Sequence, residues 1–215
     1  NKTITTLTNP GLKDINNKTI TTLTNLGLKD IRVSDVGAKI MANGIVSNSY
    51  LTSLTLSDCG IGANGARDFA NSLKTNTSLT ELRFDHNKIG DAGAAALVDA
   101  LNSSLTALNL SNCGIGANGA RDIANSLKTK TSLTVLTLGF NNIGDAGAEA
   151  LADVLALAKA FKEFQLFFCG IGQRGALALG RAWGSNLALS IGSTSEPDRH
   201  TKVHNVIGVW GEANR

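Results

Sequence analysis

The sequence lacks a long apolar run, a cluster of basic residues and a paired set of cysteines, and each absence excludes a class of protein. No stretch approaches the ~20 continuous apolar residues of a membrane span. The formal net charge is +3 without any basic run, so there is no electrostatic footprint for nucleic acid or an anionic membrane. The cysteines are an odd set without zinc-ligand spacing, namely Cys59, Cys113 and Cys169. They are better explained as buried thiols in a reducing compartment, which favours a cytoplasmic protein without a metal site.

Proline is nearly absent while glycine is abundant, with 2 prolines against 23 glycines in 215 residues. Glycine in such excess is typical of fixed structural positions, and fixed positions indicate repeats. With 42% apolar and 17% charged residues, the chain is expected to fold around a real core. It begins with Asn1 rather than Met, which is typical of a fragment or a processed form, so the lack of a signal peptide excludes little.

One short stretch, CGIGANG at residues 59–65, contains the G-x-G-x-x-G pattern of a dinucleotide-binding turn between a strand-like and a helix-like segment. The pattern returns at residues 113–119 and 169–175, and its last two glycines return at residues 90 and 93 and again at 144 and 147. A nucleotide site needs one such loop. The repetition therefore favours a structural turn and no cofactor, with Gly62 and Gly65 placed where a side chain would crowd the chain.

The glycines belong to a repeating unit that reads L-x-x-L-x-L-x-x-(C/N)-x-I-G-x-x-G-A-x-x-(apolar)-A-x-x-L. Six units are spaced by 28, 28, 26, 28 and 28 residues, starting at Leu23, Leu51, Leu79, Leu105, Leu133 and Phe161. The leucines alternate as in a short strand, and the later apolar residues recur at helical spacing. One strand and one helix cannot close a core, but stacked copies can, with parallel strands on one side and helices on the other.

These units resemble leucine-rich repeats of the 28-residue ribonuclease-inhibitor class, which also occur in NOD-like receptors and the Ran GTPase-activating protein. The resemblance covers roughly residues 23–185. It includes the ninth position of the unit, which alternates through Cys59, Asn87, Cys113, Asn141 and Cys169. The resemblance implies an α/β fold, a right-handed solenoid or horseshoe with parallel strands on the concave face and helices on the convex face. It also implies that the Asn side chains bond to loop backbone and that the Cys side chains lie buried at the turn.

The ends of the chain depart from the repeat. Residues 1–16, NKTITTLTNPGLKDIN, are nearly repeated as residues 17–32, NKTITTLTNLGLKDIR. Because Pro10 removes a backbone donor, we expect the second copy to supply the first true repeat. The predicted organisation is an irregular N-terminal segment or cap at 1–22, about six repeats and a partial one at 23–192, and a C-terminal cap or tail at 193–215. Residues 187–191, LALSI, alternate like one more strand.

A functional surface is expected at the third, fifth, seventh and eighth positions of each unit, because these vary along the chain while the framework is nearly constant. Two alternatives stay open: the phenylalanines could be core under the C-terminal segment, and the charges could be an ordinary solvated set. Exposed aromatic residues on a rigid sheet are the type that anchors interfaces. The candidate partner-binding residues are Glu81, Arg83, Asp85, His86, Asn109, Thr137, Phe140, Gln165, Phe167 and Phe168.

The predicted function is protein–protein recognition through the concave strands, with a partner that the sequence does not identify. The residue types of a hydrolase triad occur near one another, since Asp85 and His86 are sequence neighbours and Ser57 and Ser111 lie on adjoining strands. No nucleophile elbow accompanies them, so we expect no enzyme. One alternative is a GTPase-activating regulator, although the resemblance to that class extends only to the repeat framework. The other is a self-associating structural protein, in which the N-terminal strand pairs with the exposed edge of another molecule.

Overall fold

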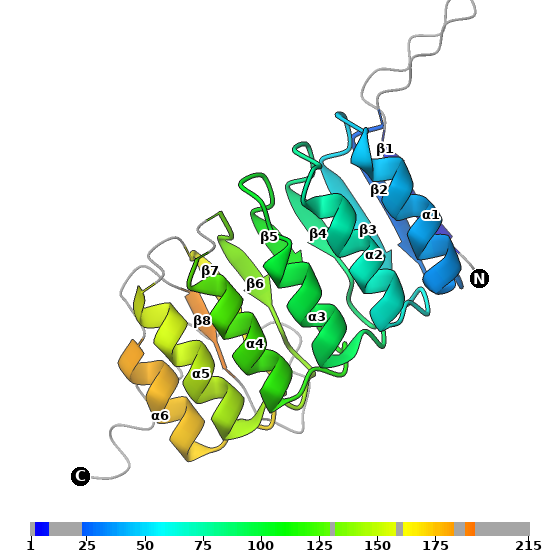
Figure 1. Ribbon diagram of the computed structural model, residues 1–215. Helices are drawn as coiled ribbons and strands as arrows, with labels where there is room; N and C mark the ends of the chain where they lie inside the picture. Colours follow the sequence, from blue (N-terminus) through cyan, green and yellow to red (C-terminus); the bar gives the residue numbers. More distant parts are fainter. Residues whose placement is uncertain (1–2, 9–22, 130–131, 158–160, 183–187, 192–215) are drawn as a thin grey trace, which may run out of the picture.

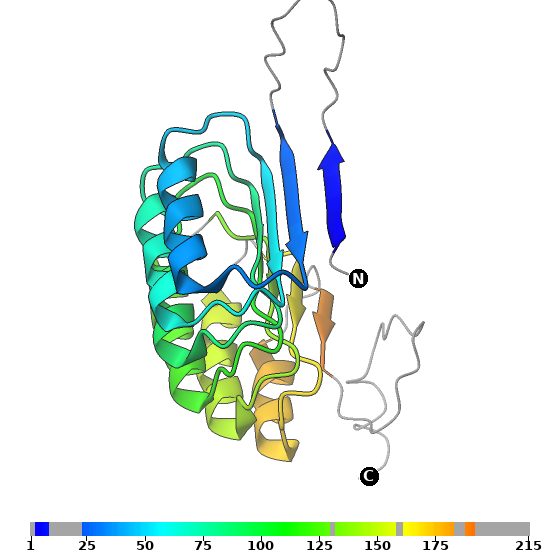
Figure 2. The same ribbon diagram turned by 90° about the vertical axis from the view of Figure 1, so that its right-hand side faces the viewer.

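The computed structural model describes residues 3–8, 23–129, 132–157, 161–182 and 188–191, which form one sheet covered on one side by helices (Figures 1 and 2). The sheet order follows the chain from β1 to β8. Its strands are β1 (Thr3–Thr8), β2 (Asn25–Lys29), β3 (Ser53–Ser57), β4 (Glu81–Arg83), β5 (Ala107–Asn109), β6 (Val135–Thr137), β7 (Glu163–Gln165) and β8 (Ala188–Ser190). The helices are α1 (Ser34–Val46), α2 (Ala63–Leu73), α3 (Gly90–Asp99), α4 (Ala117–Leu127), α5 (Gly144–Leu157) and α6 (Gln173–Ala182).

Strands β2 to β8 are parallel and in register, so equivalent residues of successive units lie side by side. Leu54 pairs with Leu82, Leu82 with Leu108, and Leu108 with Leu136. All four side chains are buried, and they face the helices as part of one continuous core. The α/β solenoid with strands on one side and helices on the other is therefore confirmed.

Both ends of the sheet carry an additional strand. β1 pairs with β2 in the antiparallel direction, and the register shifts between Ile4 and Thr6. β2 comes from the second copy of the duplicated sequence and is the first parallel strand. At the other end, the strand expected at 187–191 is present as β8, which is parallel to β7. The segment predicted as a cap or tail, 193–215, lies outside the described residues.

Buried asparagine side chains join every second unit to the one before it, as the resemblance implied. The Asn87 amide nitrogen donates to the carbonyls of Leu56 (2.6 Å) and Phe84 (2.8 Å). Its oxygen accepts from the backbone N–H groups of Cys59 (3.1 Å) and Ile61 (3.0 Å). One side chain thus satisfies the loop backbone of two units, where unpaired polar groups would be costly.

Asn141 repeats the arrangement one pair of units later. It donates to Leu110 and Leu138 (both 2.9 Å) and accepts from Cys113 and Ile115 (both 3.0 Å). The loop crossing is therefore built in the same way at two places along the stack.

The glycines of the repeated fingerprint have a different role from the predicted one. Gly65 lies in the first turn of α2, and Gly62 precedes that helix with an extended φ of −101°. The residue that turns the chain is Gly60, with φ of +66°. The carboxylate of Asp35, from the preceding unit, accepts the N–H of Gly62 at 2.6 Å. A Cβ on Gly65 would lie only 2.8 Å from that same carboxylate oxygen.

The carboxylate contact recurs in every second unit. Asp91 accepts from Gly116 at 2.7 Å, and Asp145 accepts from Gly172 at 2.7 Å and from Gly175 at 2.9 Å. A Gly-rich turn before a helix N-terminus suits an anion. Here the protein's own carboxylates fill that place, which explains the fingerprint without a nucleotide.

The alternate interfaces use close helix packing in place of a carboxylate. A Cβ on Gly93 would lie 3.1 Å from Ala66 Cβ and 3.3 Å from Ala63 Cα of α2, and 2.9 Å from Ile89. Glycine–alanine packing also occurs at the carboxylate interfaces, where a Cβ on Gly65 would lie 3.0 Å from Ala38 Cβ. The alternation between GANGA and GDAGA at the helix starts therefore follows the carboxylate contact.

Two glycine-to-alanine changes should have opposite effects on stability. In Gly65→Ala the new methyl group would press on Asp35 and Ile61, so we expect a loss of about 1–3 kcal/mol in the free energy of unfolding. In Gly44→Ala the methyl group meets nothing within 4 Å in the last turn of α1, so we expect a gain of about 0.4–1 kcal/mol. Urea unfolding of both variants checks this. Equal effects would show that Asp35 does not occupy the Gly62–Gly65 turn.

Candidate functional site

The predicted site lies on the side of the sheet away from the helices. We call the outward residues of β3 to β7 and of the turns that follow them the strand face. Strand residues between the buried leucines, such as Thr55, Asn109 and Thr137, are partly exposed. Seven of the ten predicted residues divide here into a polar group at β4 and β5 and an aromatic group after β6 and β7. The other three, His86, Thr137 and Gln165, lie outside both groups.

The polar group centres on Asp85, which is only 8% exposed. Its Oδ1 accepts from Ser57 Oγ (3.0 Å) and from Asn109 Nδ2 (3.4 Å), and lies 3.5 Å from Arg83 Nε. Ser57 was not among the predicted residues, although it occupies the same seventh position of its unit as Asp85. Because Arg83 is largely exposed, this ion pair is worth little on its own.

Ser111 continues the same row on the next unit, where the His86 N–H donates to its carbonyl at 2.9 Å. Its hydroxyl is buried and has no hydrogen-bond partner within the described part of the chain. At the start of β4, Glu81 accepts from Ser53 Oγ of β3 at 3.2 Å. Most side chains of the polar group are thus hydrogen-bonded to one another, and the Ser111 hydroxyl is the exception among the described residues.

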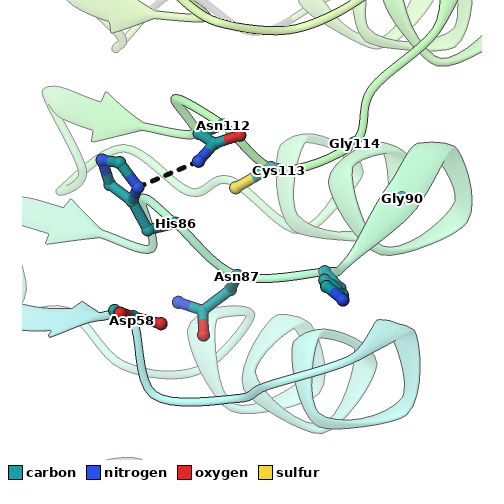
Figure 3. A pocket seen from close by; sticks show the side chains of 8 residues that line it. Asp58, His86, Asn87, Gly90, Asn112, Cys113 and Gly114 are labelled. Atoms are coloured by element: carbon teal, nitrogen blue, oxygen red, sulfur yellow. Dashed lines mark hydrogen bonds between the residues drawn. The ribbon is translucent and has the colours of Figure 1, made fainter. Parts of the chain in front are cut away.

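His86 lies at the rim of the strand face and does not join the polar group. Its Nδ1 is 2.9 Å from Asn112 Nδ2, and both side chains are exposed. Figure 3 shows this pair at the edge of a pocket of about 650 Å³, lined also by Asp58, Lys88 and Cys113. Asp85 bonds to Ser57 and His86 to Asn112, so these side chains do not form an Asp–His–Ser relay.

The aromatic group consists of Phe140, Phe167 and Phe168. The rings of Phe140 and Phe168 stack, with centroids 4.7 Å apart and planes inclined by 15°. Phe167 meets Phe140 edge-on at 5.2 Å. Gly139 makes room for it, since a Cβ there would lie 2.7 Å from the Phe167 Cζ atom. The three rings therefore form one cluster that crosses from the β7 unit to the β6 unit.

The backbone under this cluster is strained. The eighth position of six units is left-handed, at Asp30, Asp58, His86, Asn112, Phe140 and Phe168, with φ between 50° and 60°. Asp, Asn and His are the non-glycine residues that tolerate this conformation best, whereas a bulky side chain there is an outlier. Phe140 and Phe168 occupy it with 50% and 37% of their surface exposed.

Thr137 on β6 and Gln165 on β7 belong to neither group and are partly exposed. The Gln165 amide donates to Glu163 on the same strand, and Glu163 was not predicted. The expectation that the C-terminal segment covers Phe167 and Phe168 concerns residues 202–210, outside the described residues.

The three cysteines are free and buried. Their thiols donate to carbonyls of the preceding unit at Leu28, Phe84 and Leu138, at 3.5, 3.3 and 3.1 Å. Among the described residues no group of His, Cys, Asp and Glu side chains could hold a metal ion. None of the helices described is long and apolar enough to cross a bilayer.

Comparison with known proteins shows the family. Residues 47–70, 75–98, 101–124 and 129–152 each match the family model described as Leucine Rich repeat. Together with the alternating strands and helices, these four matches show that the chain is a leucine-rich repeat protein. No curated protein matches the chain.

Two solved structures illustrate what the fold resembles. One is leiomodin-1 actin-binding site 2, with 25% identity, a TM-score of 0.51, and coverage of 53% of this chain and 69% of that one. The other is the tropomodulin C-terminal domain of Caenorhabditis elegans, with 15% identity, a TM-score of 0.53, and coverage of 61% and 81%. The second likeness shows the fold alone.

The buried thiols should lose their protons at a higher pH than free cysteine does. Burial raises the pKa of Cys59 and Cys169 to about 11 and that of Cys113 to about 12, from a usual 9.0. An unfolded chain would release these protons near pH 9 while the folded chain keeps them. Their contribution to stability is therefore complete below pH 9 and is lost as the pH rises toward 11. Thiolate absorbance of the folded chain should rise only near pH 11, and a rise near pH 9 would show exposed thiols.

Replacing a strained phenylalanine should cost little stability. In Phe140→Asn, relief of the left-handed strain, about 1–2 kcal/mol, offsets lost ring contacts of about 0.5–1.5 kcal/mol. We therefore expect a melting temperature close to that of the parent. Phe164→Asn, which removes a fully buried ring, should by contrast cost several kcal/mol, at least about 3. If Phe140→Asn were equally damaging, Phe140 would be part of the core.

Proposed function

We propose that this chain is a protein-recognition module that binds its partner through the strand face, with the Phe140–Phe167–Phe168 cluster as the anchor. The observation that carries the proposal is the pair of exposed phenylalanines in left-handed conformation. Asn or Asp at these positions would satisfy the fold at lower cost, as the other units demonstrate. Strain retained at an exposed site points to a role outside folding.

The surface around the cluster supports this proposal. Parallel strands in register hold the side chains at fixed spacing, so little ordering is lost when a partner binds. Aromatic residues in an otherwise small and polar surface are typical of the few contacts that dominate binding energy. The polar group at Asp85, already bonded within the protein, would contribute orientation more than affinity.

Actin is the first partner to test. Leiomodin-1 actin-binding site 2 is a solved structure with the same repeat fold and 25% identity to this chain. The likeness covers about half of the chain, so it suggests a candidate and leaves the contacting residues to experiment. The three free buried thiols favour a reducing compartment such as the cytoplasm, in which actin occurs.

The test compares three chains for binding to monomeric actin by light scattering and to filaments by co-sedimentation. We expect the parent to bind, and Phe140→Asn to bind about 30-fold or more weakly if Phe140 is a dominant contact. Asp30→Asn alters the equivalent left-handed position in the turn after β2, outside the strand face, and should bind like the parent. Equal binding by Phe140→Asn would refute the aromatic anchor, and a parent that binds neither form would exclude actin.

A further inference from the structure

We propose that the outer edge of β1 pairs with β1 of a second copy of this chain, so that two sheets join into one. β1 is the terminal strand of the described sheet. One of its edges bonds to β2. Its other edge presents backbone N–H and C=O groups that have no strand beside them among the residues described. Such an edge is a template for pairing with another chain.

The sequence of β1 does not protect this edge. Natural edge strands are blunted by charge, by proline, by brevity, by bulges or by a covering element. β1 reads TITTLT, with six uncharged residues and no proline. At the opposite end of the sheet, β8 has three residues. The one protective feature in β1 is the register shift between Ile4 and Thr6.

No described helix covers β1. The helices follow β2 to β7 in the chain, and β2 is the described element with which β1 makes extensive contact. Figure 2 shows β1 at the end of the strand layer, running opposite to β2. Within the described part of the chain, the outer edge of β1 therefore has no neighbouring strand and no helix over it.

A second copy fits this edge by symmetry. An antiparallel pair of identical strands is related by a two-fold axis, so each copy offers the same surface and no like charges meet. The order β2–β1–β1–β2 across the pair leaves three strand spacings, roughly 14 Å, between the helix-bearing strands. A helix is about 10 Å wide, so the two α1 helices do not collide.

An exposed apolar residue on α1 lies on the same end of the stack. Gly37 of α1 is the counterpart of Gly93, which packs against the preceding helix. Ile40 lies one turn further along this face and is 68% exposed, whereas its counterpart Ala96 is partly buried. Pairing through β1 turns this face toward the second copy. The apolar exposure at this end and the open edge thus support the same contact.

The experiment measures mass by light scattering over a concentration series. We expect the parent to rise from the 22.3 kDa of one chain toward twice that value. Thr6→Lys should remain at the mass of one chain, since a charged side chain is one of the features by which natural edge strands avoid pairing. Thr129→Lys adds the same charge at an exposed residue after α4 and should behave like the parent. A parent that stays at 22.3 kDa throughout, or a Thr6→Lys chain that doubles its mass, overturns the proposal.

The Thr6→Lys change would also keep the mass low if it loosened β1 from β2. A cross-linking measurement tests the pairing of two copies without an added charge. With a short bis-maleimide, Thr6→Cys should give linked dimers and Thr129→Cys should not, because the native thiols are buried. Equal cross-linking of the two chains, or none in Thr6→Cys, overturns the proposal. Phe140→Asn should leave the mass unchanged, so this inference and the aromatic anchor succeed or fail separately.

Discussion

The buried carboxamides of Asn87 and Asn141 are the interaction on which the rest of the structure depends. Each joins four backbone groups of two successive units, at the point where the chain leaves a strand and crosses to the helix layer. Those groups are buried and would otherwise be unpaired. Because a unit cannot close a core alone, this crossing fixes the register of the strands, and the register fixes every side chain on the strand face.

The carboxylates of Asp35, Asp91 and Asp145 provide the second kind of link. Each accepts from a glycine N–H at the start of the next helix, where the backbone donors and the helix dipole favour negative charge. The geometry is the one that a nucleotide-binding turn uses for phosphate. In this chain it is used between units, and the two-unit alternation of the sequence follows from it.

The sequence was sufficient for the strands and the buried leucines, because period-2 alternation and a 28-residue spacing determine them, and the resemblance to leucine-rich repeats implied the asparagine bonds. It was insufficient for Gly65, whose requirement comes from Asp35, a residue of another unit. The left-handed eighth position could have been suspected from Asp58 and Asn112, but Phe140 and Phe168 conceal it. The sequence also does not determine that β1 is antiparallel to β2, because TITTLT can pair with a parallel or an antiparallel neighbour. Each gap arises where a neighbour in space decides the outcome.

The division of the strand face indicates how it would distribute binding energy. Asp85 is nearly buried and already bonded to Ser57 and Asn109, so a partner gains little by replacing those contacts. Phe140 and Phe168 are half-exposed, stacked and held in a conformation that their own side chains disfavour. Covering them removes apolar surface from water without further loss of rotamer freedom, because the stack is already formed. The physical asymmetry between the two groups, more than their position in the repeat, is the reason for proposing the aromatic cluster as the anchor.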